Sequence, residues 1–336
     1  MKSNTKVCLI AGGAGFIGVN LAKKLISQGH SVVIGDNFTL GSKKNIQQWV
    51  SPNFEDYKEV DISCEKDTAL LFEFCLERYG CIDEVWHLAA NSDIPAGVHD
   101  ASVDLTSTFM TTFCLLEACR KFDVKKINFA SSSAVYGDWG GIALEETLGP
   151  LKPISNYGAM KLASEAQICA ARESYLNVAN IFRFPNVVGA PATHGVILDF
   201  FNKLDCSPDK LKILGNGSQK KSYLHVSELI NAMLFISNLD QDSDEAVIIN
   251  IGCDDDGILV SDIAKIVRGI CSPNAKLEFG ETDRGWVGDV PKFSYNISLL
   301  KSLGWEPKLT SYEAIEKAAK EINKQLQTNT QKQIYD

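Results

Sequence analysis

The sequence predicts an α/β fold in which helices cover both faces of a single parallel sheet. Three observations carry this prediction: short apolar runs alternate with longer segments of helical periodicity, these runs are almost continuously apolar, and a glycine-rich segment follows the first of them. Strands that are apolar throughout are typical of parallel sheets buried on both faces. Their alternation with helices indicates a doubly wound sheet.

The elements of this sheet can be placed in order along the first half of the chain. We expect strands at residues 7–11, 31–35, 83–88, 126–130 and 177–182, and helices at 15–27, 105–121 and 157–173. A helix at 226–237 and a strand at 246–251 then continue the same sheet.

The regular alternation weakens after Phe184, where glycine and proline residues interrupt the pattern. We therefore predict a main domain formed by residues 1–184 plus about 222–251. A smaller, sequence-discontinuous C-terminal lobe, formed by 185–221 plus about 252–326 and ending in a helix at 311–326, is expected to bind the substrate. Residues 327–336 are polar and are expected to form a frayed tail.

Composition and charge restrict the class of protein. The chain is 45% hydrophobic and 22% charged, as ordinary globular proteins are, and its net charge of −9 argues against a broad nucleic-acid surface. None of the ten cysteines has a spacing suited to zinc, so we expect no metal site and reduced thiols. No secretory signal and no run of about 18 apolar residues is visible, which predicts a cytoplasmic protein without a membrane segment.

A glycine-rich loop between the first strand and the first helix predicts a dinucleotide cradle of the Rossmann type. Gly12, Gly15 and Gly18 follow the pattern G-x-x-G-x-x-G, and Phe16 and Ile17 complete the turn into the helix. The first glycine allows a tight turn, the second lets backbone approach a pyrophosphate, and the third lets the helix pack close to the strand. The free N–H groups at the start of the helix favour the phosphates.

An acidic residue closes the second predicted strand. Asp36, followed by Asn37, can accept hydrogen bonds from both adenosine ribose hydroxyls and would repel a 2′-phosphate, which favours NAD over NADP. The alternative is a simple turn residue.

Two further segments are candidates for contact with the cofactor. Asp61 and Ile62 follow a short strand-like stretch and are expected to border the adenine, although aspartate also begins many turns. Leu88, Ala89 and Ala90 end the strand at 83–88, where small residues let a cofactor pass close to the backbone.

A tyrosine and a lysine four residues apart predict a proton-transfer site. Tyr157 and Lys161 share one face of the helix at 157–173. A phenol has a pKa of about 10, and we expect the nearby ammonium group to lower that of Tyr157 so that it can take a proton from a sugar hydroxyl. A hydroxyl from the serines at 131–133, which end another strand, would hold the same oxygen.

Taken together, these motifs resemble the extended short-chain dehydrogenases/reductases of the nucleotide-sugar epimerase/dehydratase family. The resemblance runs from Val7 to about Leu309 and rests on GGAGFIG at 12–18, HLAA at 87–90, SSSAVYG at 131–137, YGAMK at 157–161, FRFPNVVG at 182–189 and SYLHVSEL at 222–229. It implies that Ser132 is the catalytic hydroxyl and Ser133 its auxiliary neighbour. It also implies a homodimer formed through the helices at 105–121 and 157–173.

The residues after the catalytic hydroxyl bear on the reaction. Family members that eliminate water or carbon dioxide carry a carboxylic residue there, whereas this chain has Ser133 and Ala134. The pattern therefore favours 4-epimerisation and is most similar to the UDP-glucose 4-epimerase-like members. A UDP-glucuronate decarboxylase, a 2-epimerase, a dehydratase, a keto-sugar reductase and a non-catalytic NAD-sensing regulator remain alternatives.

The resemblance also implies four substrate contacts. Asn186 matches a position that contacts the nucleotide diphosphate, and Lys221 and Arg284 match cations that grip it. Phe293 falls where 4-epimerases place the residue that limits bulk at C2 of the sugar, so its ring would disfavour N-acetyl sugars. A solvated surface charge is the alternative for both cations.

Overall fold

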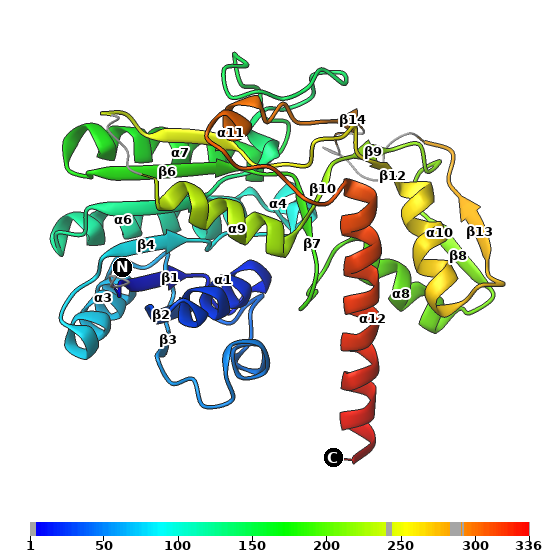
Figure 1. Ribbon diagram of the computed structural model, residues 1–336, viewed down its shortest axis with the longest axis horizontal. Coiled ribbons are helices and arrows are strands. Elements are labelled where there is room, and N and C mark those ends of the chain that lie inside the picture. Colours follow the sequence, from blue (N-terminus) through cyan, green and yellow to red (C-terminus); the bar gives the residue numbers. More distant parts are fainter. Residues whose placement is uncertain (1–4, 240–243, 283–289, 291, 336) are drawn as a thin grey trace. The chain divides into compact units, whose positions relative to one another are not determined.

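The computed structural model describes residues 5–239, 244–282, 290 and 292–335. The chain divides into two compact units (Figure 1). The first unit comprises Met1–Gly137, Gly149–Arg183 and Ala232–Ile249, and the second comprises Asp138–Leu148, Phe184–Asn231 and Asn250–Asp336. The domain division expected from the sequence differs in placing 138–148, 184, 222–231 and 250–251 with the first part, and it stays a prediction.

The first unit is built on a seven-stranded sheet with the order β11-β6-β5-β4-β1-β2-β3 (Figure 1). From β3 to β6 every neighbouring pair is parallel. The strands are β1 (Val7–Ala11), β2 (Ser31–Asp36), β3 (Tyr57–Glu59), β4 (Glu84–His87), β5 (Lys126–Ala130), β6 (Val178–Arg183) and β11 (Val247–Asn250). The predicted doubly wound fold is therefore confirmed.

Strand order in this sheet reverses between β1 and β4. The chain leaves β1 toward β2 and β3, and then returns to build β4, β5 and β6 on the other side. Open α/β sheets bind ligands at such a reversal, outside the carboxyl ends of the strands. Here the carboxyl ends of β1, β4, β5 and β6 are Ala11, His87, Ala130 and Arg183.

The longer helices of the first unit pack with the sheet and bury apolar side chains, whereas the three shortest bury almost none. They are α1 (Phe16–Ser27), α2 (Lys43–Asn45), α3 (Glu65–Tyr79), α4 (Ile94–His99), α5 (Ala101–Asp104), α6 (Thr111–Lys121), α7 (Asn156–Ser174) and α9 (Val226–Ser237), which continues into this unit from the second. Helix α3 packs on α6, and α6 packs on α7. Their apolar side chains meet those of the strands in one core, which includes Leu9, Val85, Ile127, Phe72, Leu115 and Ile168.

Two helices of the first unit differ from the elements expected from the sequence. Helix α3 has no counterpart among the predicted helices, yet it buries Leu71, Phe72 and Cys75. The expected helix at 105–121 is divided, since Leu105–Met110 forms a π-helical segment before α6. Such segments insert one extra residue into the turn, which apolar periodicity does not reveal.

The second unit has its own core between helices and short strands. Helices α8 (Val196–Cys206), α10 (Val260–Cys271) and α12 (Ser311–Tyr335) pack on one another, and α8 and α10 also pack on β8 (Lys210–Ile213), which pairs in parallel with β13 (Lys276–Phe279). The small sheets join β7 (Asn186–Val188) to β10 (Tyr223–His225), and β9 (Lys220–Lys221) to β12 (Ile258–Leu259) and β14 (Lys292–Phe293). The short helix α11 (Ser298–Ser302) follows β14.

Helix α12 continues to Tyr335, past Leu326 where we expected a frayed tail to begin. In the part of the chain that the structure describes, no helix combines the length and the apolar character needed to cross a membrane.

Candidate active site

The glycine-rich loop joins β1 to α1, and its three glycines meet different surroundings. A Cβ atom on Gly12, whose φ is +79°, would lie 2.6 Å from the backbone nitrogen of Ala89, and one on Gly18 would lie 2.5 Å from the carbonyl oxygen of Gly12. A Cβ on Gly15 would meet only that same oxygen, at 3.5 Å. Gly12 and Gly18 are therefore required by the packing of the loop itself, whereas Gly15 leaves open space at the start of α1, as a pyrophosphate needs.

Asp36 closes β2 beside this loop and is almost fully buried. Its Oδ2 accepts a hydrogen bond from the backbone nitrogen of Ala14 at 2.9 Å, and its Oδ1 accepts one from Phe38 at 2.8 Å. Burial raises the pKa of Asp36, and these two hydrogen bonds oppose that rise. Each carboxylate oxygen has two acceptor sites, so both can still accept a ribose hydroxyl.

The other predicted cofactor residues lie around the same edge of the sheet. Leu88 donates from its backbone nitrogen to Ala11 at 2.9 Å, which holds the segment Leu88, Ala89 and Ala90 against the end of β1. The side chains of Phe16 and Ile17 are half-buried in the first turn of α1, and Asn37 is exposed after β2.

Asp61 and Ile62 follow β3. Asp61 is exposed, and its Oδ1 accepts hydrogen bonds from the backbone and hydroxyl of Ser63, as in a turn. Ile62 is buried in the core of the first unit. Asp61 therefore makes the contacts expected of a turn residue. Its contact with the adenine stays a prediction.

The predicted proton-transfer residues meet at the carboxyl ends of β5 and β6. Ser155 caps α7 by accepting from Gly158, so that Tyr157 and Lys161 follow on the first two turns. Ser132 follows β5 and hydrogen-bonds with Tyr157. The Nζ of Lys161 lies 5.8 Å from the centre of the Tyr157 ring. The three side chains that the sequence singled out are therefore brought together.

The three consecutive serines have different partners. Ser131 is buried, and its hydroxyl donates to the carboxylate of Glu165. Ser132 points to Tyr157 and also caps the short turn at 133–135 by accepting from Ala134. Ser133 is half-buried at the start of that turn. Ser132 is therefore the serine of the three whose hydroxyl meets Tyr157, and its contact with the substrate stays a prediction.

Lys161 is deeply buried for a charged residue, with 2% of its surface exposed. Its Nζ donates to the carbonyl oxygen of Ala130 at 2.6 Å and lies 4.6 Å from the centre of the Phe129 ring. Burial lowers the pKa of Lys161 to about 7, although the charge of Glu165 acts in the opposite direction. The protonation of this lysine is thus balanced near neutral pH.

The electrostatics of Tyr157 differ from the sequence-based expectation. We expected the nearby ammonium group to lower its pKa, but burial raises the pKa of Tyr157 to about 12. The hydrogen bond with Ser132 acts against this rise, and the charge of Asp104 adds to it. The phenol is therefore the stable form in this structure, because the cost of burying a phenolate exceeds the help from its neighbours.

Of the predicted substrate residues, three lie in the described part of the second unit. Lys221 of β9 and Phe293 of β14 are register partners in neighbouring strands, and both are largely buried. Asn186 begins β7 opposite Tyr223 and is exposed. Arg284 lies outside the described residues.

Three residues at this site were not found from the sequence. Glu165 and Arg183 form a buried ion pair behind Lys161, and Asp104 is a fully buried carboxylate whose charge acts on Tyr157. A signal existed only for Glu165, which follows Lys161 by four residues on the same helix face.

Comparison with known proteins places this site in a family. The model of the NAD dependent epimerase/dehydratase family matches residues 8–252. A crystal structure of a UDP-galactose 4-epimerase is 32% identical, with a TM-score of 0.81 over 95% of this chain and 99% of that one. A UDP-glucose 4-epimerase from Thermotoga maritima, solved with UDP-glucose, is 26% identical, with a TM-score of 0.82 over 95% and 99%. UDP-glucuronic acid decarboxylase 1 of Danio rerio is 24% identical over 97% of this chain and 75% of its own length.

The chain therefore belongs to the NAD-dependent epimerase/dehydratase family. Its fold is the Rossmann-type sheet of the epimerase structures, and its cofactor is NAD. Both the resemblance and the cofactor predicted from the sequence are confirmed. The cradle fits that cofactor, since it combines open space at Gly15 with a carboxylate at Asp36 that retains free acceptor sites.

Proposed function

We propose that this protein is a nucleotide-sugar 4-epimerase, acting on a UDP-hexose, with Tyr157 as the acid and base. The observation that carries the proposal is the meeting of Ser132, Tyr157 and Lys161 at the edge of the sheet where the cradle lies. A proton donor and acceptor, a supporting hydroxyl and a cation are the groups needed to oxidise and reduce one alcohol carbon.

Each side chain has a distinct part in the proposed reaction. When bound in the cradle, NAD would supply the hydride acceptor and donor, and in its oxidised form a positive charge that would favour the phenolate. Ser132 holds the 4-oxygen of the sugar, and Tyr157 takes its proton as the carbon is oxidised. After the 4-keto sugar has presented its other face, Tyr157 returns the proton to the same oxygen. Lys161 supports the phenolate with positive charge.

The residues of the second unit are proposed to bind the substrate. Lys221 and Arg284 would supply positive charge to the diphosphate, Asn186 would donate to it, and Phe293 would limit bulk at C2 of the sugar. The placement of Phe293 beside Lys221 in the register of β14 and β9 supports a common site for these two residues. We also propose a homodimer formed through 105–121 and 157–173, and a cytoplasmic location.

UDP-glucuronate decarboxylation is the second candidate, favoured by the similarity to the decarboxylase of Danio rerio. We rank it lower because Ser133 and Ala134 place no carboxylic acid next to Ser132. Ser132, Tyr157 and Lys161 support the removal and return of one proton.

Product analysis tests the proposal directly. The purified protein, with no added cofactor, would be incubated with UDP-glucose, UDP-glucuronate, UDP-N-acetylglucosamine and CDP-, GDP- and dTDP-hexoses, and the products resolved by chromatography with mass spectrometry. We expect an isomer of unchanged mass from a UDP-hexose. Loss of carbon dioxide or water would contradict the proposal, and a preference for UDP-N-acetylglucosamine would contradict the part assigned to Phe293.

Tyr157→Phe separates the enzyme from an NAD-sensing regulator. Because general acid–base catalysis contributes about 10²–10⁴-fold, we expect turnover to fall by at least about 10²-fold while NAD stays bound. Tyr175→Phe is the matched control, since its hydroxyl donates to the carbonyl of Leu116, on α6, and not to a residue of the proposed site. Equal turnover in the two variants would refute the role of Tyr157.

A further inference from the structure

Behind the proton-transfer site lies a buried ion pair that the proposed reaction does not use. Tyr157, Lys161 and Glu165 follow one another at intervals of four residues on α7 and so share one face. Glu165 pairs with Arg183 at the end of β6, and their side chains are only 3% and 4% exposed. Arg183 donates from Nη2 to Oε2 at 2.6 Å and from Nε to Oε1 at 3.0 Å.

Further hydrogen bonds fix this pair from two other elements. Ser131, which follows β5, donates to the Oε1 of Glu165, and the Nη1 of Arg183 lies 3.1 Å from the hydroxyl of Tyr136. The guanidinium carbon also lies 4.9 Å from the centre of the Tyr136 ring. A buried carboxylate is strongly unfavourable unless it is paired and hydrogen-bonded, and Glu165 is both. Its negative charge is therefore held at a fixed place, one helical turn from Lys161.

Lys161 needs such a charge to remain an ammonium group. Its Nζ bonds to the neutral carbonyl of Ala130, and burial lowers its pKa to about 7. Among the described residues, the anion whose charge raises this pKa is Glu165. Without it, the lysine would lose its proton at a lower pH and with it the support for a phenolate at Tyr157.

Other titratable groups around Lys161 do not replace Glu165. His87, on β4, is fully buried, and burial together with the charge of Lys161 holds its pKa well below 6.5, so it is neutral. It bonds through Nε2 to Thr112 of α6 at 2.8 Å. Asp104 of α5 acts on Tyr157, and its charge raises the pKa of the phenol rather than that of the lysine.

We propose that Glu165 and Arg183 form a positioning pair for the proton-transfer site: the carboxylate keeps Lys161 an ammonium group near Tyr157, and Arg183 keeps the carboxylate charged and in place. The inference rests on the proposed function, since it assigns a purpose to the charge of Lys161. It adds two positioning residues, Glu165 and Arg183, which act through Lys161.

The test follows the protonation of Lys161 itself. The NAD-bound protein, labelled with ¹³C-lysine, would be titrated from about pH 4.5 to about pH 9.5 by NMR, with the Lys161 resonance assigned through Lys161→Arg. In Glu165→Gln we expect its midpoint to fall by about one pH unit, which is roughly tenfold less ammonium at a fixed pH above the midpoint. The high-pH limb of kcat should move down by the same amount.

Two further variants keep the test decisive if Glu165→Gln does not fold or changes more than the charge. Glu165→Gln/Arg183→Met removes both charges of the pair, so neither partner is left unpaired, and it should show the same direction of shift if the single variant does not fold. Glu165→Asp restores a carboxylate and should return the midpoint toward that of the wild type.

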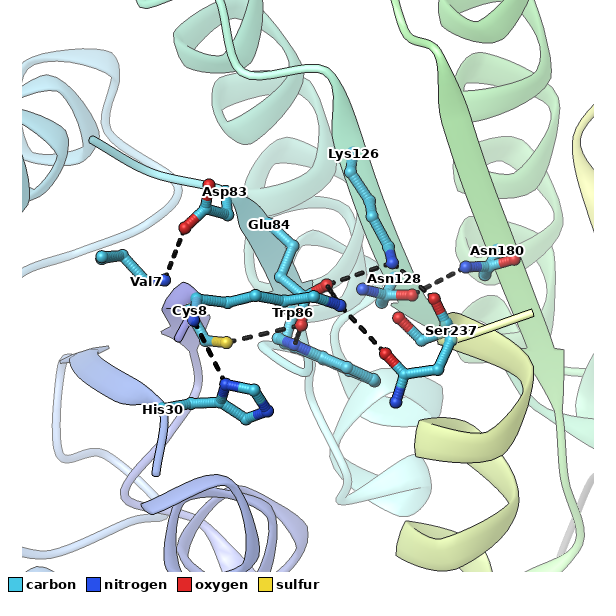
Figure 2. A network of polar contacts seen from close by, with 12 residues as sticks. Val7, Cys8, His30, Asp83, Glu84, Trp86, Lys126, Asn128, Asn180 and Ser237 are labelled. Atoms are coloured by element: carbon cyan, nitrogen blue, oxygen red, sulfur yellow. Dashed lines mark hydrogen bonds and ion pairs between the residues drawn. The ribbon is translucent and has the colours of Figure 1, made fainter. Parts of the chain in front are cut away.

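Glu84→Gln is the matched control. Glu84 is a second buried glutamate with cationic partners in the same unit, at the opposite ends of the strands (Figure 2). It should leave the Lys161 midpoint unchanged.

The outcomes separate this inference from the proposed function. An unchanged Lys161 midpoint in both Glu165→Gln and the double variant would overturn the positioning role, whatever the turnover. A lowered midpoint in a protein that converts no nucleotide sugar would support the electrostatic role of Glu165 and reject the epimerase.

Discussion

Two buried acid–base clusters lie at opposite ends of the same parallel strands, and they differ in how they meet solvent. The amino-edge cluster consists of Glu84, Lys6 and Lys126, near the starts of β4, β1 and β5. Figure 2 labels Glu84 and Lys126 of this cluster. The carboxyl-edge cluster consists of Glu165 and Arg183, beside Lys161. Both hold a glutamate that is 2–3% exposed, but the lysines of the first cluster are 30% and 17% exposed, whereas Arg183 is 4% exposed.

This difference separates a structural role from a role in chemistry. At the amino edge, Lys126 donates to the carbonyl of Ser237 at 2.5 Å and Lys6 to Asn238 at 2.9 Å, so the cluster also ties the end of α9 to the sheet. Water can still reach both lysines. At the carboxyl edge the charges are shielded from water, where electrostatic effects on a neighbouring group are larger. One cluster therefore holds the sheet to a helix, and the other is suited to control Lys161.

Arg183→Met should produce the largest loss of stability. Removing one partner of a fully buried pair leaves Glu165 charged and unpaired, which costs about 3–5 kcal/mol. Arg183→Met/Glu165→Met should recover most of that loss, because neither charge remains. The free energy of unfolding would be compared by urea titration.

Lys126→Met provides the amino-edge counterpart. Glu84 keeps Lys6, and the site is partly hydrated, so the cost should be smaller than for Arg183→Met. If Arg183→Met/Glu165→Met is as unstable as Arg183→Met, the stability lost in Arg183→Met comes from packing and not from an unpaired charge. The contrast between the two clusters would then fail.

Glu84→Gln should have an intermediate effect on stability, with a defined pH dependence. Burial opposes the charge of Glu84, but Lys126 and Lys6 more than offset it, and its pKa lies below the ordinary 4.5. A lowered pKa in the folded state contributes stability above about pH 4.5, and this contribution is lost as the pH falls through the folded value. At pH 7 the variant should therefore lose about 1–3 kcal/mol.

The pH dependence of that loss is the decisive measurement. The difference from the wild type should shrink as the pH falls from about 4.5 through the lowered folded-state pKa of Glu84. Glu73→Gln, in an exposed pair with Lys121, should change the free energy of unfolding by less than about 0.5 kcal/mol. A loss at Glu84→Gln that is constant with pH would indicate altered packing rather than a lost charge.

The sequence predicts the strands and the pair Tyr157 and Lys161, but it does not predict the buried ion pair at the carboxyl edge. Period and apolarity locate the strands, and β1 and β5 have the predicted bounds, because each is buried through most of its length. Tyr157 and Lys161 are found because their spacing on a helix is local. Arg183 is not, since it meets Glu165 only when α7 packs on β6.

Electrostatic balance is harder to predict than position. Placing Lys161 near Tyr157 predicts a lowered pKa for the phenol, but the outcome depends on how far both groups are removed from water. Burial is a property of the assembled sheet and helices and not of the motif. For the same reason the sequence does not reveal Asp104. Its side chain is fully buried, but it lies next to a π-helical segment whose residues show no apolar period that would predict burial.

Asp104→Asn should have the smallest effect and tests whether the carboxyl edge acts through charge alone. Asp104 accepts a hydrogen bond from Asn91 at 2.8 Å, which an asparagine can retain through its carbonyl oxygen. Loss of the negative charge should lower the pKa of Tyr157, by less than about one unit because burial is the larger cause. Fluorine NMR of protein labelled with 3,5-difluorotyrosine, a stronger acid than tyrosine, brings the titration into a pH range the fold tolerates.

Asp93→Asn is the control, since Asp93 is exposed and asparagine can also cap α4. It should leave the Tyr157 midpoint in place. A midpoint that rises in Asp104→Asn would mean that Asp104 holds Tyr157 by position and not by charge. In that case the charge of Asp104 would not control the pKa of Tyr157. Asp104 would then have a structural role, as the amino-edge cluster has.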